Sequence, residues 1–210
     1  MTIRHHLSDP LLMAYAAGSL PEAFGLVVAT HISMCDTCRA QLAAFEAVGG
    51  AVIGAAPVAL SEGALQAAMA RLDMPATAAP VAKRCDLPAP LGDYIGGNLA
   101  DVKWRSLGMG VRQAILPTDT AATARLLYIP AGQAVPDHGH RGTELTLVLR
   151  GAFCDEVDRF GPGDVEIANQ ELQHVPVAEA GSDCICLAAT DAPLRFNAWL
   201  PRLLQPLFRI

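Results

Sequence analysis

The sequence lacks an excess of positive charge and any dense cluster of lysine and arginine. Its 210 residues include 15 Lys and Arg against 21 Asp and Glu, which gives a net charge of −6. Proteins that bind nucleic acid usually present a basic face. The composition therefore argues against direct binding of DNA or RNA.

Long hydrophobic runs are also missing. The longest apolar stretch, residues 47–60, is interrupted by glycines and by Pro57. It is shorter than the roughly 20 residues that a membrane-spanning helix needs. The first ten residues carry charge but lack the apolar core of a signal peptide. We therefore expect a soluble, cytoplasmic protein that does not contact a membrane.

Charged residues are few, at 17% of the chain, whereas hydrophobic residues make up 52%. This balance is typical of a folded chain and not of a disordered one. The length is sufficient for two small domains. The six cysteines fit metal ligands and free thiols better than a disulfide framework in a cytoplasmic chain.

Four metal-binding side chains lie near the amino terminus. His31, Cys35 and Cys38 form an H-x3-C-x2-C cluster, and His6 lies about one helical hairpin upstream. Two thiolates and two imidazoles complete a tetrahedral zinc shell, and a shell without an open position is typical of a structural site. His31 and Cys35 are four residues apart, so they share a face if the helix extends that far. The pattern predicts structural Zn²⁺ where one helix ends and the next begins.

Other interpretations of this cluster stay open. Cys35 and Cys38 also have the spacing of a redox dithiol, and His31 alone is compatible with a core histidine. His5 competes with His6 for the fourth position, because on a helix the two side chains point about 100° apart. The four positions taken together favour zinc.

The first 75 residues have the apolar spacing of several helices. Proline in a first turn and glycine after a last turn mark their limits. The expected helices are one that ends near Gly18, one that opens at Pro21, one that is capped by Asp36 and ended by Gly49-Gly50, and one over 62–72.

A linker over 76–92 is expected to follow this helical domain, 1–75. Four prolines lie among alanines between residues 73 and 90, and apolar periodicity is weak there. Beyond the linker, short runs of β-forming residues predict an antiparallel sandwich or barrel. These runs are 102–104, 111–115, 124–129, 145–149, 152–157, 165–167, 174–177 and 184–188.

The expected fold is therefore an α+β multidomain chain. An N-terminal zinc-binding helical bundle precedes a C-terminal antiparallel β-barrel or jelly roll over 93–195. The remaining residues, 196–210, form an apolar tail broken by two prolines. We expect this tail to dock on the β domain.

The strand-rich part contains a second group of candidate metal ligands. His138, His140 and Glu144 form an H-x-H-x3-E pattern, and His174 comes from a later strand. Residues i and i+2 of a strand share a face, so the two histidines can converge with Glu144 beside them. Three nitrogens and one oxygen suit zinc, iron, manganese or nickel. The alternative is that these are ordinary loop, strand-face and core side chains.

This second group carries a resemblance to the cupins. The segment Gly161-Pro162-Gly163-Asp164, followed by His174, resembles the second cupin motif, although Val177 and Ala178 stand where an asparagine is usual. The resemblance covers roughly the C-terminal half and implies a cupin fold that binds Zn²⁺ or another divalent metal. The positions that resemble the first cupin motif are Gly132, His138, His140, Glu144 and Gly151.

The order of the two ligand sets resembles a more specific family. The set formed by His6, His31, Cys35 and Cys38 resembles the zinc-binding anti-sigma domain, and this domain followed by a cupin looks like the ChrR-type anti-sigma factors. The resemblance spans almost the whole chain. It implies that the helices hold an extracytoplasmic-function sigma factor as a 1:1 heterodimer. It also implies that the cupin is required to release the sigma factor upon oxidative stress of the singlet-oxygen type.

An enzyme is the alternative. A cupin metal dioxygenase or isomerase with a helical zinc appendage also fits the second ligand set, because a fold does not determine a function. However, the sequence offers no clear general base beyond the ligands themselves. The helical segment also carries more apolar side chains than a bundle of its size buries easily, which favours a binding protein over an enzyme.

Two further cysteines occupy the last expected strand. Cys184 and Cys186 are two residues apart, so they face the same way. They are candidate redox thiols near the second metal. Free cysteine is commonly a small core residue, and we favour that interpretation.

Overall fold

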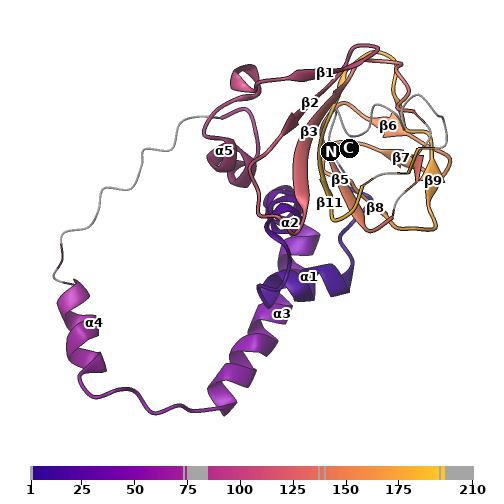
Figure 1. Ribbon diagram of the computed structural model, residues 1–210. Coiled ribbons are helices and arrows are strands. Elements are labelled where there is room, and N and C mark those ends of the chain that lie inside the picture. The colour runs from indigo at the N-terminus through magenta and orange to yellow at the C-terminus, as the bar shows by residue number, and fades with distance from the viewer. Residues whose placement is uncertain are drawn as a thin grey trace.

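The computed structural model describes residues 2–72, 74, 85–136, 138–139, 141–193 and 195–196, with the backbone alone at 138, 195 and 196. In this part of the chain, helices come first and antiparallel strands follow (Figure 1), as the sequence predicts. The apolar tail predicted over 196–210 lies almost entirely outside the described residues. The helices are α1 (Asp9–Ala16), α2 (Glu22–Met34), α3 (Asp36–Ala55), α4 (Ala64–Leu72) and α5 (Ala89–Ile95), with a 3-10 turn over Leu99–Asp101.

The strands form an antiparallel sandwich. The larger sheet has the order β1-β2-β3-β11-β5-β8 and remains open at its two end strands, so it does not close into a barrel. Two smaller sheets have the orders β10-β6-β7 and β12-β4-β9. The strands are β1 (Arg105–Gly108), β2 (Val111–Ile115), β3 (Thr123–Ile129), β4 (His138–Gly139), β5 (Glu144–Arg150), β6 (Phe153–Cys154), β7 (Arg159–Phe160), β8 (Val165–Ala168), β9 (Gln173–His174), β10 (Val177–Ala178), β11 (Cys184–Thr190) and β12 (Arg195–Phe196).

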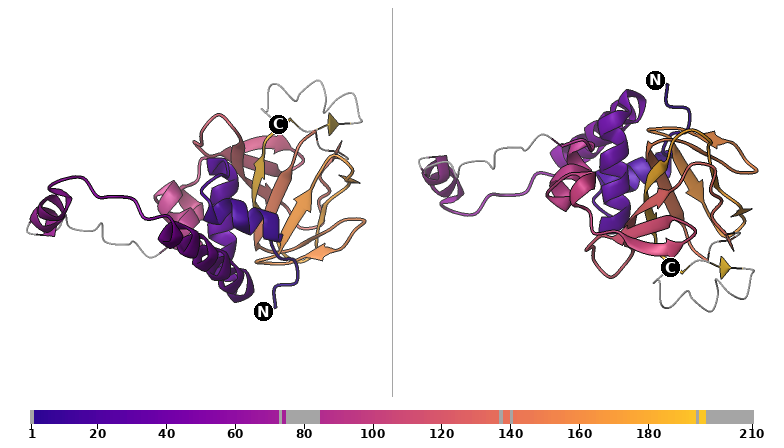
Figure 2. Two further views of the ribbon diagram at one scale, coloured as in Figure 1. Left: turned by 90° about the horizontal axis from the view of Figure 1, so that it is seen from below. Right: turned by 90° about the horizontal axis from the view of Figure 1, so that it is seen from above.

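Helix α2 lies on the larger sheet and joins the helices and the sandwich into one core. It packs against β3, β5 and β11 (Figures 1 and 2), and seven of its thirteen residues are buried. The helical segment is therefore attached to the sheet through an apolar interface as well as through the intervening chain. The shared core includes Phe24, Val27 and Val28 of α2 with Leu126, Leu145 and Leu187 of the sheet.

Helix α5 was not predicted from the sequence. It begins within the segment expected to be a linker and packs against α2. Leu87 and Leu91 are buried in the shared core, and Gly96 ends the helix in the left-handed conformation, with φ 69°. The C-terminal end of the expected linker thus contributes to the core.

Local predictions at the end of the third helix and at the first expected strand are wrong. Gly49 and Gly50 do not end the third helix, because both keep helical backbone and α3 continues to Ala55. Glycine ends a helix where it adopts the left-handed conformation, and nothing in the sequence separates that case from a helical glycine. Residues 102–104 precede β1 and do not form a strand. Among the described residues, no helix is both long and apolar enough to cross a membrane.

Candidate metal centres

The structure brings together the four predicted N-terminal ligands. Candidate donor atoms of His6, His31, Cys35 and Cys38 all lie within 4.8 Å of one another. The Nδ1 atom of His6 lies 3.3 Å from the Cys35 sulfur and 3.6 Å from the Cys38 sulfur. His5 points elsewhere, toward Asp158, whose carboxylate lies 3.2 Å from His5 Nε2. His6 is thus the histidine that joins the cluster.

The junction of α2 and α3 positions the two sulfurs. Cys35 has extended backbone and caps α3, and its sulfur accepts the Cys38 backbone N–H at 3.5 Å. Asp36, predicted to be the cap, is instead the first helical residue and pairs with Arg39. Because the cap and the third residue of a helix face each other across its first turn, both sulfurs point to the same side.

Burial determines the protonation of the ligands. His31 is fully buried, and this burial lowers its pKa to about 4, so that the imidazole stays neutral at physiological pH. Burial raises the pKa of the Cys38 thiol to about 11. A buried pair of thiolates requires compensating positive charge, which a bound divalent cation supplies.

The orientation of His31 also fits a metal ligand. Its Nδ1 donates to the backbone carbonyl of Gly163 at 2.9 Å. Among the described residues, its buried Nε2 has no hydrogen-bond partner. An unpartnered nitrogen beside two sulfurs and a second imidazole is the arrangement that a four-coordinate metal ion satisfies.

The second predicted ligand set lies partly outside the described residues, which exclude His140 and the side chain of His138. The backbone of β4 places His138 opposite His174 of β9 in antiparallel register. Glu144 begins β5, and its carboxylate accepts the Thr146 hydroxyl at 3.0 Å. The structure thus places two of the predicted histidines on neighbouring strands.

Sequence reasoning missed two carboxylates that contact His174. The Nδ1 atom of His174 lies 2.9 Å from Asp155 Oδ2 and 3.0 Å from Glu166 Oε1. Burial alone would lower the pKa of His174, but hydrogen bonds and charge from Glu166 and Asp155 outweigh burial and raise it to about 9. The three side chains form a second cluster with the composition of a metal site. The only sequence signal was a carboxylate, Glu166, between two apolar residues of a predicted strand.

Cys184 and Cys186 lie in the interior of the sandwich. Both are buried, and their sulfurs are 3.5 Å apart. The hydrogen bond between Cys186 and Cys184, together with burial, raises the pKa of Cys186 well above its ordinary value. Thiols in such surroundings are poor nucleophiles. Their redox role stays a prediction.

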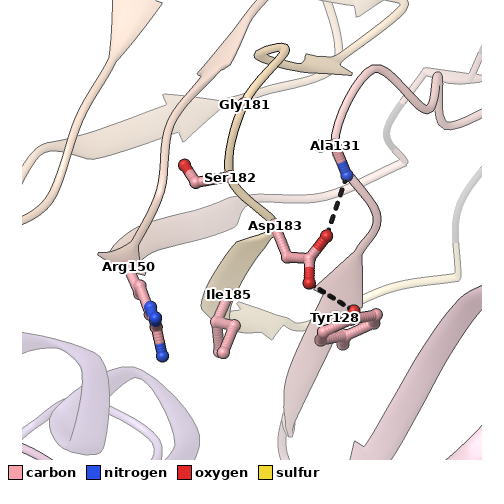
Figure 3. Close-up of a pocket in the computed structure, with 7 residues that line it drawn as sticks. All are labelled: Tyr128, Ala131, Arg150, Gly181, Ser182, Asp183 and Ile185. Carbon is pink, nitrogen blue, oxygen red and sulfur yellow. Dashed lines mark hydrogen bonds between the residues drawn. The ribbon is translucent and has the colours of Figure 1, made fainter.

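A pocket of about 340 Å³ lies where β3 and β5 end and β11 begins, at one end of these three neighbouring strands of the larger sheet (Figure 3). Asp183 accepts the Tyr128 hydroxyl at 2.5 Å and the Ala131 backbone N–H at 3.0 Å. Among its described lining residues, none belongs to the predicted ligand sets. The lining consists of Tyr128, Ala131, Arg150, Gly181, Ser182, Asp183 and Ile185.

Comparison with known proteins shows similarity along the whole chain. Residues 94–193 match the ChrR cupin-like domain. The chain is 68% identical over 213 residues to the anti-sigma-E factor ChrR of Cereibacter sphaeroides, and the match covers 100% of both sequences. It also matches a chain in the crystal structure of Rhodobacter sphaeroides SigE in complex with the anti-sigma ChrR, with a TM-score of 0.82 and 67% identity. That match covers 90% of this chain and 100% of the other.

Proposed function

The chain belongs to the ChrR family of anti-sigma factors, and we propose that it sequesters an extracytoplasmic-function sigma factor in a 1:1 complex. The observation that carries this proposal is a series of exposed apolar side chains on the distal half of α3, on α4 and on the segment between these helices. The related chain in the crystal structure was solved with SigE, which supports the same class of partner here.

These side chains form what we call the distal apolar surface. Helix α4, described over its full length, has no buried residue, and it stands apart from the sandwich in every view (Figures 1 and 2). Large exposed apolar patches mark protein-binding surfaces, and an amphipathic helix commonly docks in an apolar groove of its partner. The distal apolar surface comprises Val48, Val52, Ile53, Val58, Leu60, Leu65, Met69 and Leu72, each more than half exposed.

The N-terminal metal is Zn²⁺ in this proposal. Two thiolates and two imidazoles are a common structural zinc set, and the unpartnered Nε2 of His31 supports an ion at this place. When bound, the ion supplies cross-links between the N-terminal segment, α2 and α3. The residues Cys35 and Cys38 set the direction in which α3 leaves α2, and therefore the place of the distal apolar surface.

The sandwich is the part that responds to stress in this proposal. It holds Zn²⁺ or another divalent metal through His138, His140, Glu144 and His174, and oxidative stress of the singlet-oxygen type releases the sigma factor. The resemblance to the family supports this step. The proposal places the complex in the cytoplasm, because a sigma factor acts there with RNA polymerase, and it assigns no reaction to the chain.

The binding step is tested by a matched pair of variants in the full chain. Leu65→Ser removes one member of the distal apolar surface, and Val157→Ser removes an apolar side chain of similar exposure from the sandwich; the two residues are 68% and 65% exposed. We expect Leu65→Ser to weaken sigma binding about tenfold, which corresponds to about 1.4 kcal/mol, and Val157→Ser to leave it unchanged. Equal affinities for both variants, measured by calorimetry, contradict the proposal.

The response step is tested separately in cells. A photosensitiser and light generate singlet oxygen, and sigma-dependent transcription is followed for the wild type and for Glu144→Ala. We expect basal repression in both strains but induction in the wild type alone. Equal induction in both strains contradicts a metal-dependent response of the sandwich. It does not contradict the proposal that the chain binds a sigma factor.

A further inference from the structure

We propose that the turn 161–164 of the sandwich is an outer shell of the N-terminal metal site, so that the sandwich contributes to the metal affinity of the helices. The inference rests on the proposed Zn²⁺ assignment. The turn joins β7 to β8 and contains Gly161, Pro162, Gly163 and Asp164. It contacts one member of the N-terminal ligand set, His31, and the segment that precedes another, His6.

The first contact is with a ligand itself. His31 Nδ1 donates to the Gly163 carbonyl across 132 residues of sequence. A metal-binding histidine needs its other ring nitrogen held by a hydrogen bond, which selects the tautomer and the ring orientation, and loss of such a partner typically costs 10–100-fold in metal affinity. The backbone of the sandwich therefore presents His31 Nε2 to the cluster.

The second contact holds the segment that carries His6. One carboxylate oxygen of Asp164 accepts the backbone N–H groups of Arg4 at 2.6 Å and His5 at 2.9 Å. The backbone N–H of Val165 donates to the His5 carbonyl at 3.2 Å. The chain before His6 is thus laid along the start of β8, and Asp164, which is 4% exposed, is the buried anchor of this arrangement.

The close approach of the two segments depends on a glycine. Gly163 adopts φ +89°, a conformation that favours glycine, and a Cβ atom added there would lie 2.6 Å from Ile3 Cδ1. The Ile3 side chain occupies the space in which a side chain at position 163 would lie. The turn 161–164 and the N-terminal segment are therefore complementary in shape as well as joined by hydrogen bonds.

The same stretch of chain leads to the second metal cluster. Glu166 lies two residues after Asp164 and contacts His174 Nδ1 at 3.0 Å. Residues 163–166 thus touch a candidate ligand of each centre. Only three peptide bonds separate Glu166 from Gly163, so both candidate centres are in contact with one short stretch of backbone.

Cobalt provides the test in the full-length protein. Thiolate-to-cobalt charge-transfer absorption reports the site with Cys35 and Cys38, whereas the proposed ligands of the sandwich offer only nitrogen and oxygen. The apoprotein is titrated with Co²⁺, and Zn²⁺ then competes for the site. We expect Asp164→Ala to lower the affinity for both metals about tenfold, and Asp164→Asn to fall between Asp164→Ala and the wild type.

The matched control is Asp158→Ala. Asp158 is also an acid facing His5, but it is 57% exposed, and its carboxylate contacts the imidazole ring, at 3.2 Å from Nε2. Its removal is expected to leave the metal affinity unchanged. An equal loss in Asp158→Ala and Asp164→Ala overturns the inference, because net charge would then explain both.

A second variant covers the case in which Asp164→Ala does not fold, since Asp164 also accepts the Gly161 backbone N–H at 2.8 Å. Ile3→Ala loosens the contact from the N-terminal side and leaves the turn intact. If Asp164→Ala or Ile3→Ala folds and keeps the wild-type affinity for Co²⁺ and Zn²⁺, the inference is overturned. A wild-type chain without any thiolate-to-cobalt band contradicts the zinc assignment instead, so the two failures are distinguishable.

Discussion

Helices α2 and α3 follow each other directly and are both rich in apolar residues, yet they are used differently. Seven of the thirteen residues of α2 are buried, whereas α3 buries two of its twenty, Cys38 and Leu42, both in its first two turns. Helix α2 covers the larger sheet, and the distal half of α3 has no such cover among the described residues. Apolar composition therefore marks an interface in both helices, but the partner of α2 lies within the same chain.

The metal cluster lies at the boundary between these two uses. Cys35 ends α2 and caps α3, so a metal ion bound there, as proposed, would cross-link the helix that packs on the sheet to the helix that leads to the distal apolar surface. A change at the cluster should therefore affect both regions, whereas a change within either helix should affect one.

The largest effect is expected from removing both thiolates. The double variant that combines Cys35→Ser with Cys38→Ser leaves the metal without a sulfur ligand. Structural zinc in small modules contributes on the order of 10 kcal/mol of apparent binding energy. We expect loss of bound zinc and of sigma binding, while the sandwich keeps its fold. Zinc analysis, near-ultraviolet circular dichroism and sigma pull-down measure the three outcomes. Full sigma binding by the zinc-free variant would show that the cluster does not position α3.

A matched pair of leucines separates the two helical regions. Leu26 of α2 is 6% exposed and Leu65 of α4 is 68% exposed. We expect Leu26→Ala to lower the free energy of unfolding by about 2–5 kcal/mol, the usual range for a buried leucine, and Leu65→Ala to change it by less than about 0.5 kcal/mol. Urea denaturation of the full chain measures both. Similar costs would mean that α4 packs against the rest of the chain in solution.

A smaller effect is expected at the junction of α2 and α5. The Tyr94 hydroxyl contacts Glu22 Oε1 at 3.0 Å and the Pro117 carbonyl at 2.6 Å, so it connects the start of α2 to the loop after β2. Tyr94→Phe is expected to cost about 1 kcal/mol of unfolding free energy, the typical net value of a hydrogen bond. The affinity for the sigma factor should stay unchanged. A loss of affinity in Tyr94→Phe would show that the surface that binds the sigma factor includes α5.

The smallest effect concerns a contact far from both helical regions, between Tyr128 and Asp183 in the pocket of Figure 3. The hydrogen bond raises the pKa of Tyr128 above that of an ordinary tyrosine and lowers the pKa of Asp183 below that of an ordinary aspartate. Because the pKa of Tyr128 is higher in the folded state, this contact stabilises the fold at neutral pH, and the stabilisation is lost as the pH rises through the folded-state pKa of Tyr128. Because the pKa of Asp183 is lower in the folded state, the stabilisation is also lost as the pH falls through the folded-state pKa of Asp183.

The difference in unfolding midpoint between the wild type and Tyr128→Phe should therefore be present at neutral pH and vanish at both extremes. Thermal unfolding at a series of pH values measures it. A difference that is constant across the whole range would show that the phenyl ring, and not the hydrogen bond, accounts for the effect.

The sequence predicts the N-terminal cluster well because its spacing is local. His31, Cys35 and Cys38 lie within eight residues of sequence, across the junction of α2 and α3, so local backbone geometry brings them near. Asp155 and Glu166 could not be predicted in this way, because Asp155 follows β6, Glu166 lies in β8 and His174 lies in β9, and these strands belong to three different sheets. Only the packing of the sheets against one another brings the three side chains together. Helix α5 was missed for a related reason: its prolines indicated a linker, and only the packing of Leu91 under α2 shows what the segment does.

The contact between His31 and Gly163 also orders events during synthesis. The carbonyl that holds His31 follows it by 132 residues, and a ribosome adds roughly 5–20 residues per second, so on the order of ten seconds separate the two. During that interval the nascent chain presents Cys35 and Cys38 before the turn that orients His31 has been made. The hydrogen bond that orients His31 therefore forms only after the chain has been made as far as Gly163.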